Sequence, residues 1–438
     1  MNKYLISWAI IFSMVSCVDK IEFEQDQYIK ILGLEGSAVA EKVEEMENGD
    51  ILVLGKIGVA SHEISTGYIA SEFESTEDKA PFIAICDQNG NIKKRRSYPI
   101  EGLDLPHADI IDIGNKTTFH EILKSPDGGY VILAQLRNFD LTFYFPSDTI
   151  DFPTSPSNQT INPLLLKLNS DLDLEKIISI NAHENWDYIY RAKARMKRLQ
   201  NGDIGLLLGI KAHNLTQLVG YSFLRLDDDL NILEKAEDFD MPNLKMAYDF
   251  VQDYSARITI LGESSDKIAL FRIPFDNMVR DEEEMREIDG SGEVPNFNEH
   301  FILEQGNNNY AVLYSNPASR VLFNVVDENL NPLYSPVEIP NPSPTKDLIR
   351  VPRAFYQTIN GDFLAYNIHI PDSQEPVEGY IQRITSSGEQ IWAIQIEGTP
   401  GDVSETQEGD ILVVANTIYN GQLHRINLIK LNAHGELF

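Results

Sequence analysis

The sequence predicts an all-β chain that forms a seven-bladed β-propeller, with four antiparallel strands in each blade. Short apolar runs alternate with turns rich in Gly, Asn and Asp, a pattern typical of tight antiparallel hairpins. Two such units recur in the same order along most of the chain, and an unpaired strand precedes the first of them. These observations predict the number of blades and the way in which the ring closes.

The first repeated unit is a polar turn, often Asn-Gly or Asp-Gly, followed by an apolar run. Gly and Asn suit such turns because they adopt positive φ angles readily. Five clear copies lie at 47–55, 126–134, 200–209, 360–365 and 408–415. Two degenerate copies, 256–262 and 308–313, fill the gap before the fourth clear copy, so the unit occurs seven times.

The second unit is an apolar strand, a polar turn and another strand, and it follows each copy of the first. Its seven copies lie at 82–91, 165–173, 223–231, 270–277, 322–331, 381–389 and 428–436. The turn residues of the first unit are at positions 49, 128, 202, 256, 308, 361 and 409. Apart from two insertions in the first half, their spacing is about 50 residues, and four strands in such a period indicate a propeller blade.

The two ends of the chain are predicted to share the last blade. The sequence stops just after the seventh copy of the second unit, so that blade lacks most of its fourth strand. A strand at about 28–34 stands before the first unit without a partner there. We expect this strand to complete the last blade, because the closure removes two open sheet edges and makes residues 28–438 one domain.

The repeats also resemble those of a group of bacterial proteins. Runs of the form Asp-Gly-Gly-Tyr-Ile-Leu-Ala-Gly, each followed by Leu-Val-Lys-Leu-Asp-x-x-Gly, recur in surface and secreted proteins of Bacteroidota-like bacteria. Residues 28–438 look like a degenerate seven-bladed member of that group, as in the copy at 126–134. The resemblance implies the architecture and is nearly silent about chemistry.

The N-terminal segment resembles a bacterial lipoprotein signal. A basic start precedes an apolar stretch that ends in Ser16-Cys17 and is too short to span a bilayer. The resemblance to a lipobox implies a signal peptide of residues 1–16, lipidation of Cys17 and a tether of residues 17–27. Val18 points to the outer membrane, because Asp at this place often means inner-membrane retention in such lipoproteins. An ordinary signal peptide with a chance cysteine is the alternative.

Composition restricts the partners and the redox chemistry. The formal net charge of −31 disfavours nucleic acids and anionic lipid surfaces. It is compatible with basic partners or divalent cations, and equally with a well-solvated acidic surface. With Cys17 lipidated, Cys86 is the only other cysteine, so no intrachain disulfide can form. Cys86 lies in an apolar run, and we expect a buried, inert thiol in a fold held by its core.

Length variation concentrates at one predicted face of the disc. With the strands of a blade named a to d, the a–b and c–d turns lie on one face and are tight, whereas the b–c and d–a connections lie on the other. The long connections are at 57–80, 136–163, 181–191, 280–298 and 336–352. Long loops on a rigid scaffold commonly carry binding sites. Their aromatic residues form either a platform for a glycan or protein, or a small core under the loops: Phe139, Phe143, Tyr144, Phe145, Phe152, Trp186, Tyr188 and Tyr190.

The sequence shows no motif of a catalytic or metal site. The acidic run 227–231 looks like a calcium loop, but it lacks the Gly and Glu that such a loop requires and coincides with a repeated turn. The nine histidines have no zinc-site spacing, and the sequence contains no Gly-x-Ser-x-Gly, His-Glu-x-x-His, P-loop or Rossmann pattern. We therefore predict no cofactor, no metal and no catalytic residue.

The predicted function is that of a lipid-anchored, non-catalytic binding or scaffold subunit. It would belong to a bacterial outer-membrane or cell-surface complex for secretion or nutrient uptake. Its partners would be proteins of that complex or a glycan, bound at the face with the long connections. The alternative is a propeller enzyme, either a glycoside hydrolase or a polysaccharide lyase, with acid/base carboxylates near the central channel.

Overall fold

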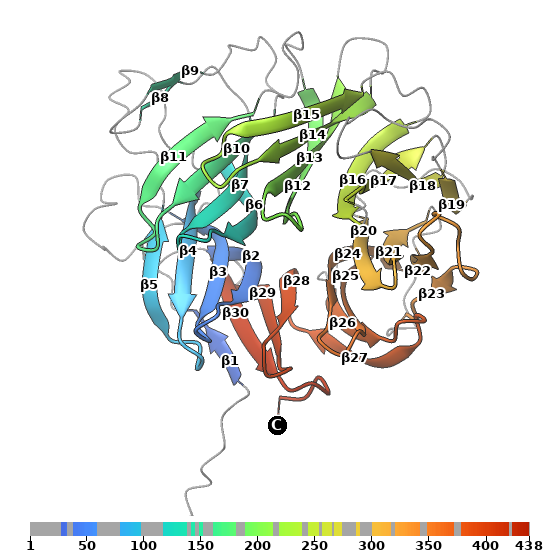
Figure 1. Ribbon diagram of the computed structural model, residues 1–438. Helices are drawn as coiled ribbons and strands as arrows, with labels where there is room; N and C mark the ends of the chain where they lie inside the picture. The colour runs from blue at the N-terminus through green and yellow to red at the C-terminus, as the bar shows by residue number, and fades with distance from the viewer. Residues whose placement is uncertain are drawn as a thin grey trace, which may run out of the picture.

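Seven four-stranded antiparallel sheets form a ring around a central channel, and the described part of the chain contains no helix (Figure 1). The computed structural model describes residues 28–32, 38–58, 79–97, 117–137, 142–144, 149–151, 161–180, 189–212, 219–238, 244–253, 256–264, 267–273, 286–289, 300–316, 320–341, 348–371, 378–419 and 423–437. None of these residues forms a helix that could cross a membrane. The predicted seven-bladed β-propeller is confirmed.

In the first four blades the strands follow one another from the channel outwards. Blade 1 consists of β2 (Ala38–Glu45), β3 (Ile51–Gly58), β4 (Lys79–Cys86) and β5 (Ile92–Ser97). Blade 2 consists of β6 (Thr117–Lys124), β7 (Tyr130–Arg137), β10 (Ile161–Leu168) and β11 (Leu174–Ser179). Blade 3 consists of β12 (Ile189–Arg198), β13 (Ile204–Ala212), β14 (Val219–Leu226) and β15 (Ile232–Asp238). Blade 4 consists of β16 (Leu244–Gln252), β17 (Ile258–Ser264), β18 (Lys267–Ile273) and β19 (Arg286–Asp289).

Two further blades repeat this order, and the last one joins the chain ends. Blade 5 consists of β20 (Phe301–Gly306), β21 (Asn309–Ser315), β22 (Val321–Val326) and β23 (Val337–Glu338). Blade 6 consists of β24 (Leu348–Gln357), β25 (Phe363–Pro371), β26 (Glu378–Ile384) and β27 (Gln390–Ile396). Blade 7 consists of β28 (Thr399–Glu405), β29 (Ile411–Tyr419), β30 (Leu423–Leu431) and β1 (Tyr28–Ile31).

The N-terminal strand closes the ring, as the sequence predicts. β1 pairs antiparallel with β30, with Tyr28 opposite Lys430, and the pairing continues when Leu32 N–H donates to Ile426 O at 3.0 Å. Asn416 joins blades 7 and 1 through two hydrogen bonds to the backbone of Ala40. Asn416 Oδ1 accepts the N–H of Ala40, and Asn416 Nδ2 donates to the carbonyl oxygen of Ala40. The predicted closure is therefore confirmed, with the strand ending at Ile31.

The a–b turns confirm the predicted repeat residue by residue. A positive φ is found at every one of the seven predicted turn positions: Gly49, Gly128, Gly202, Ala256, Asn308, Gly361 and Gly409. In the clear copies an N–H donates back across the turn, for example Gly49 N–H to Met46 O at 2.8 Å. Ala256 adopts this conformation with φ 60° although its Cβ makes it unfavourable.

Three c–d turns place a leucine in the left-handed backbone conformation, which was not predicted from the sequence. Leu172, Leu230 and Leu330 have φ between 61° and 65°, in turns where other blades use Gly. Their side chains are buried in the clusters between blades. Burial of the side chain offsets the strain of the left-handed backbone. The run 227–231 is such a turn: Asp227 Oδ1 accepts the N–H of Asn231, which confirms the turn interpretation.

The core is divided into seven apolar clusters, one between each pair of neighbouring blades. Middle strands are buried on both faces, so β17 and β22 are buried along their whole length. Cys86 is fully buried in the cluster between blades 7 and 1, and burial raises the pKa of its thiol to about 12. The predicted burial of the Cys86 thiol is therefore confirmed, and its inertness stays a prediction.

Some predicted long connections contain strands. The hairpin β8 (Thr142–Tyr144) and β9 (Thr149–Asp151) lies within 136–163. β19 lies within 280–298 as the outer strand of blade 4, and β23 lies within 336–352 as the outer strand of blade 5. The last two segments are therefore not single loops, because each includes the fourth strand of its blade.

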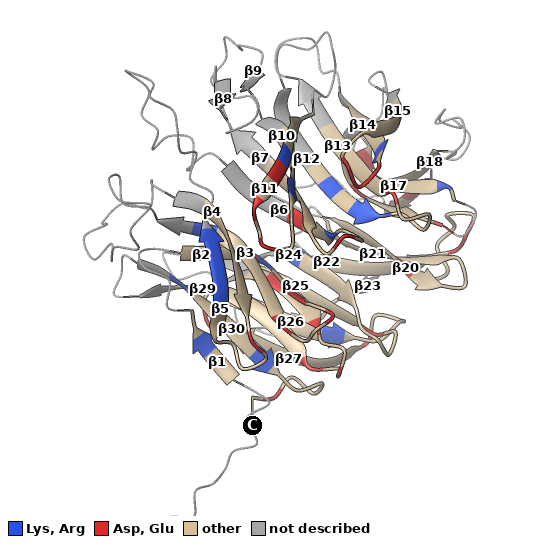
Figure 2. Ribbon diagram, turned by 60° about the vertical axis from the view of Figure 1, so that its left-hand side comes forward, with Lys and Arg blue, Asp and Glu red and all other residues tan. Residues whose placement is uncertain are grey.

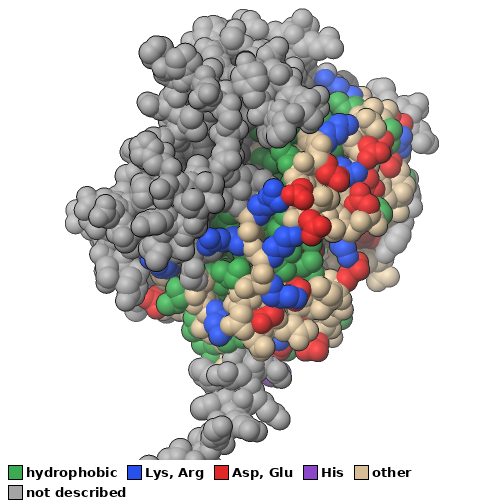
Figure 3. All heavy atoms as spheres, turned by 90° about the vertical axis from the view of Figure 1, so that its left-hand side faces the viewer, with side chains coloured by type: hydrophobic (Ala, Val, Ile, Leu, Met, Phe, Trp, Pro, Cys, Tyr) green, Lys and Arg blue, Asp and Glu red, His purple; other side chains and the backbone are tan. Residues whose placement is uncertain are grey.

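Surface cations are largely matched with carboxylates. Figure 2 shows a run of Lys and Arg along the outer strand β5. Lys94 Nζ lies 3.1 Å from Asp171 Oδ1, and Arg96 pairs with Asp173, both carboxylates being in the turn between β10 and β11. On the side of the ring at the left of Figure 1, Figure 3 shows the described cations and carboxylates next to one another.

Candidate functional site

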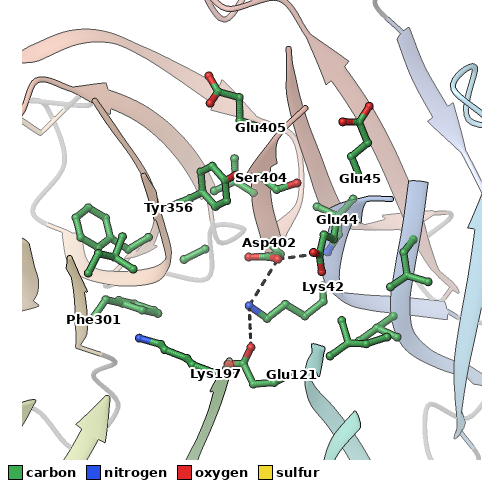
Figure 4. Close-up of a pocket in the computed structure, with 18 of the residues that line it drawn as sticks. Lys42, Glu44, Glu45, Glu121, Lys197, Phe301, Tyr356, Asp402, Ser404 and Glu405 are labelled. Atoms are coloured by element: carbon green, nitrogen blue, oxygen red, sulfur yellow. Dashed lines mark hydrogen bonds and ion pairs between the residues drawn. The ribbon is translucent and has the colours of Figure 1, made fainter. Parts of the chain in front are cut away.

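A cavity of about 460 Å³ occupies the central channel and is lined by the innermost strand of every blade. It lies towards the a–b turns, because its walls include Glu45 and Glu405, which end β2 and β28, and Ile359, which follows β24. Figure 4 shows charged side chains converging on it from several strands. The tight-turn end of the channel is therefore a described, hollow and charged site.

The cavity contains one residue from the same position of each inner strand. That position is seven residues before the a–b turn residue, and in order from blade 7 it holds Asp402, Lys42, Glu121, Arg195, Asp249, Phe301 and Ala354. Five of these neighbours alternate in charge around the channel. We call the charged members, together with Lys197, the charge belt.

β-bulges place this position. In five of the seven inner strands the ladder register shifts immediately before the belt position: Ala40/Lys42, Phe119/Glu121, Ala247/Asp249, Pro352/Ala354 and Pro400/Asp402. A bulge adds one residue and changes the direction of the side chains that follow it. The repeated bulge therefore explains why the same position reaches the channel in blade after blade.

Ion pairs connect the belt across blades. Lys42 Nζ lies 3.4 Å from Glu121 Oε2 and 3.7 Å from Asp402 Oδ2. Arg195 continues the chain, with Nη1 at 3.3 Å from Glu121 Oε1 and its guanidinium 5.2 Å from the Phe301 ring centroid. These contacts tie blades 7, 1, 2, 3 and 5 together at the channel wall.

Lys197 and Asp249 form the second part of the belt. Lys197 Nζ lies 2.7 Å from Asp249 Oδ1 and donates to the oxygen of Phe250 at 2.7 Å and of Ile302 at 3.2 Å. Asp249 Oδ2 accepts the N–H of Ile302 at 3.0 Å. The ammonium and the carboxylate together join blades 3, 4 and 5.

Four channel carboxylates accept backbone N–H groups from a neighbouring blade. Besides Asp249, Asp402 Oδ2 accepts Val43 N–H at 3.3 Å, which joins blades 7 and 1. Glu45 Oε2 accepts Gln407 N–H at 2.7 Å, and Glu405 Oε2 accepts Ile359 N–H. Such bonds between a carboxylate and an amide are charge-assisted and fix the two inner strands relative to one another.

Burial and neighbouring charge perturb several of these groups. Burial raises the pKa of Asp402 despite the opposing ammonium of Lys42, and burial also raises the pKa of Glu405. Burial opposes the charge of Lys42, but the carboxylates of Asp402 and Glu121 outweigh it and raise its pKa. The pKa of Tyr356 rises through burial and then through nearby carboxylates, Glu405 first. Groups with shifted pKa values in a cavity are typical both of functional sites and of structural ion-pair networks.

The residues predicted from the sequence lie elsewhere or outside the described part. Phe143 and Tyr144 lie on β8 and Tyr190 lies on β12. Cys17, Phe139, Phe145, Phe152, Trp186 and Tyr188 are outside the described residues. The aromatic platform and the lipid anchor therefore stay predictions. The search of the described residues finds no group of three or more His, Cys, Asp or Glu that could hold a metal ion.

Sequence reasoning missed the charge belt, although the repeat contains its signal. Counting back seven residues from each predicted turn position gives all seven belt-position residues. Their types differ from blade to blade, so the position does not stand out as a motif. Only the structure shows that alternating charges at this position meet across the channel.

Comparison with known proteins finds similar solved structures but no matching family. No protein-family model matches the chain, and no curated protein matches it. An alpha-L-arabinanase of Penicillium chrysogenum complexed with arabinobiose is 15% identical with a TM-score of 0.41, over 56% of this chain and 95% of its own. The NanB sialidase of Streptococcus pneumoniae is 10% identical with a TM-score of 0.40, over 94% and 71%. The Dos1 propeller is 10% identical with a TM-score of 0.48, over 93% and 98%.

Proposed function

We propose that this chain is a lipid-anchored, non-catalytic binding or scaffold propeller of a bacterial outer-membrane or cell-surface complex. The observation that carries the non-catalytic part is the use of the channel carboxylates. Asp249, Asp402, Glu45 and Glu405 each hold a backbone N–H of a neighbouring blade. Carboxylates bound in this way position strands, so the described channel serves to fasten the ring.

The anchoring part rests on the N-terminal signal and on Cys17. Expression of the full chain in a diderm bacterium, followed by membrane fractionation and acyl labelling, tests it. The wild type is expected to carry label in the outer-membrane fraction, and Cys17→Ala is expected to lose both the label and the membrane association. Label that persists in Cys17→Ala, or an unlabelled wild type, would contradict the anchor.

The binding part assigns partner recognition to the face with the long connections, through the predicted aromatic platform. Cross-linking and co-purification from membranes would identify the partner of the wild type. Trp186→Ala together with Tyr144→Ala is expected to reduce the partner yield without changing the melting temperature. Leu333→Ala, which removes a side chain that is 51% exposed at another surface, is the control. An unchanged yield with the double variant would refute the platform.

Polysaccharide cleavage is the second candidate function. It is favoured by Asp402 and Glu405, which lie in the cavity and have raised pKa values, as general acids often do. Incubation with a polysaccharide panel and measurement of new reducing or unsaturated ends distinguishes the two. Turnover that Asp402→Asn abolishes in a folded protein would replace the binding proposal.

A further inference from the structure

We propose that the tight-turn end of the channel binds an organic cation: a primary ammonium or guanidinium group on a flexible chain. This site lies at the a–b turn end of the ring, and the aromatic platform is predicted for the other face. It does not depend on the function proposed above, because it rests only on described cavity residues.

The cavity has two layers of charge. The belt contains as many cations as carboxylates: Lys42, Arg195 and Lys197 with Glu121, Asp249 and Asp402. Nearer the turns lies a second layer, the acidic rim, which consists of Glu44, Glu45 and Glu405. Figure 4 shows Glu45 and Glu405 on the same side of the close-up, beyond Asp402 and Lys42. The three cations of the cavity lining belong to the belt, where Lys42 and Lys197 pair with belt carboxylates, although Lys42 also acts on the charge of Glu44 in the rim.

Two buried oxygen atoms in the cavity wall have no hydrogen-bond partner, and this observation is independent of the charge count. They are Ser404 Oγ and Glu405 Oε1, in side chains that are 5% and 7% exposed as residues. Glu405 already uses its other oxygen for Ile359 N–H. Buried polar atoms without a partner are uncommon in folded proteins. Both atoms are enclosed by the protein, so a ligand that donates hydrogen bonds would supply the missing partner once these side chains turn towards the cavity.

The hydrogen-bonding groups that remain open in the cavity favour a cation over an anion as ligand. Lys42 already contacts two carboxylates. Lys197 already contacts one carboxylate and two backbone oxygens. The donors are therefore engaged, while acceptors remain open. Tyr356 and Ile359 add an aromatic ring and an apolar wall beside the rim, which suit the methylene stem of an amine or arginine.

The described residues also distinguish between kinds of cation. No three carboxylates, histidines or cysteines among them converge as metal ligands, so an extended organic cation fits better than a metal ion. The cavity of about 460 Å³ is within the usual range for small-ligand sites. Its ligand chemistry could come from a free polyamine or from a basic side chain of a protein partner.

Titration calorimetry with the full folded chain tests the proposal. One arm uses spermidine, a second uses a short neutral peptide with one central arginine, and inorganic phosphate is the anion control. We expect spermidine or the peptide to bind with an affinity that falls with added salt, and phosphate not to bind. Binding of spermidine points to a small molecule, and binding of the peptide alone points to a protein partner.

Matched substitutions locate the site. Glu405→Gln keeps an oxygen for Ile359 N–H but removes the charge, and should weaken binding roughly tenfold or more. Glu45→Gln repeats the test at the rim, and Ser404→Ala removes the second unpartnered oxygen. Glu47→Gln is the control, because Glu47 lies outside the cavity and pairs with Lys124 at 2.7 Å. The proposal is overturned if neither cation binds, or if Glu47→Gln weakens binding as much as Glu405→Gln and Glu45→Gln do.

Discussion

Replacing Lys42 by Met tests whether the charge belt holds the ring together. The substitution keeps most of the apolar stem and removes the ammonium, which leaves Glu121 and Asp402 without the cation at 3.4 and 3.7 Å. The Lys42 side chain is 31% exposed, whereas the carboxylate side chains are 15% and 10% exposed. Breaking a fully buried pair costs about 3–5 kcal/mol and an exposed one about 0–1 kcal/mol, so this intermediate case should cost about 1–3 kcal/mol.

Urea unfolding at pH 7, followed by tryptophan fluorescence, measures the loss. Lys94→Met is the matched control, because Lys94 Nζ is closer to its partner, at 3.1 Å from Asp171 Oδ1, but the two side chains are 38% and 81% exposed. It should cost about 0–1 kcal/mol, since water screens an exposed pair. If Lys94→Met lowers the free energy of unfolding as much as Lys42→Met, the assignment of the belt as an inter-blade fastener is wrong.

The pH dependence gives the same prediction a second readout. The folded-state pKa of Lys42 is raised, so its contribution to stability is complete below the pKa of the unfolded chain, about 10.4 for lysine. That contribution is lost as the pH rises from there through the folded-state pKa. The difference in stability between wild type and Lys42→Met should therefore stay constant from pH 8 to pH 10 and shrink above it. A difference that stays just as large well above pH 10 would point instead to lost packing of the stem, because packing does not depend on the charge of Lys42.

The remaining predictions concern the turns, the closure, the rim and the thiol. Leu230→Gly relieves a left-handed leucine but removes a buried side chain, so urea unfolding should show a net loss of roughly 1–3 kcal/mol; a gain would mean that strain outweighs burial. Leu32→Ala should cost about 2–4 kcal/mol, because Leu32 is 2% exposed between blades 7 and 1, and an unchanged midpoint would contradict its docking. Burial raises the folded-state pKa of Glu405, so the stabilising effect of this carboxyl group is complete below its pKa in the unfolded chain and is lost as the pH rises. The wild type should therefore gain stability relative to Glu405→Gln as the pH falls from 7 to 4. A constant difference in stability would argue against the pKa shift. Cys86 should resist iodoacetamide at pH 8 until urea unfolds the chain, whereas rapid labelling of the native protein would contradict its burial.

The architecture was predictable because its repeat is imposed by backbone geometry. An a–b turn with a positive φ selects Gly or Asn, and this preference recurs often enough to reveal the weak copies at Ala256 and Asn308. The pairing of β1 with β30 followed from a missing strand at one end and a spare strand at the other. These inferences need only local conformational preferences and the requirement that sheet edges be paired.

The channel site was not predictable by the same reasoning. Lys42, Glu121 and Asp402 are ordinary charged residues in sequence, and their pairing depends on closure of the ring across more than 350 residues. Bulges that direct them inwards leave no sequence mark comparable to an Asn-Gly turn. The leucines in c–d turns were missed because their burial, which compensates the backbone strain, is a tertiary property.

The joining of the first strand to the last has a consequence for the order of events during synthesis. Tyr28 faces Lys430, so the earliest part of the ring to be made waits for nearly the latest before it can pair. Blades 1 to 6 contain all their strands from one continuous stretch and can begin to form as they emerge, whereas blade 7 and the cluster that it shares with blade 1 can be completed only once β30 has been made. Closure of the ring is thus delayed until β30 has been made, and the open ring that exists before then has two unpaired edges that must be kept from other chains.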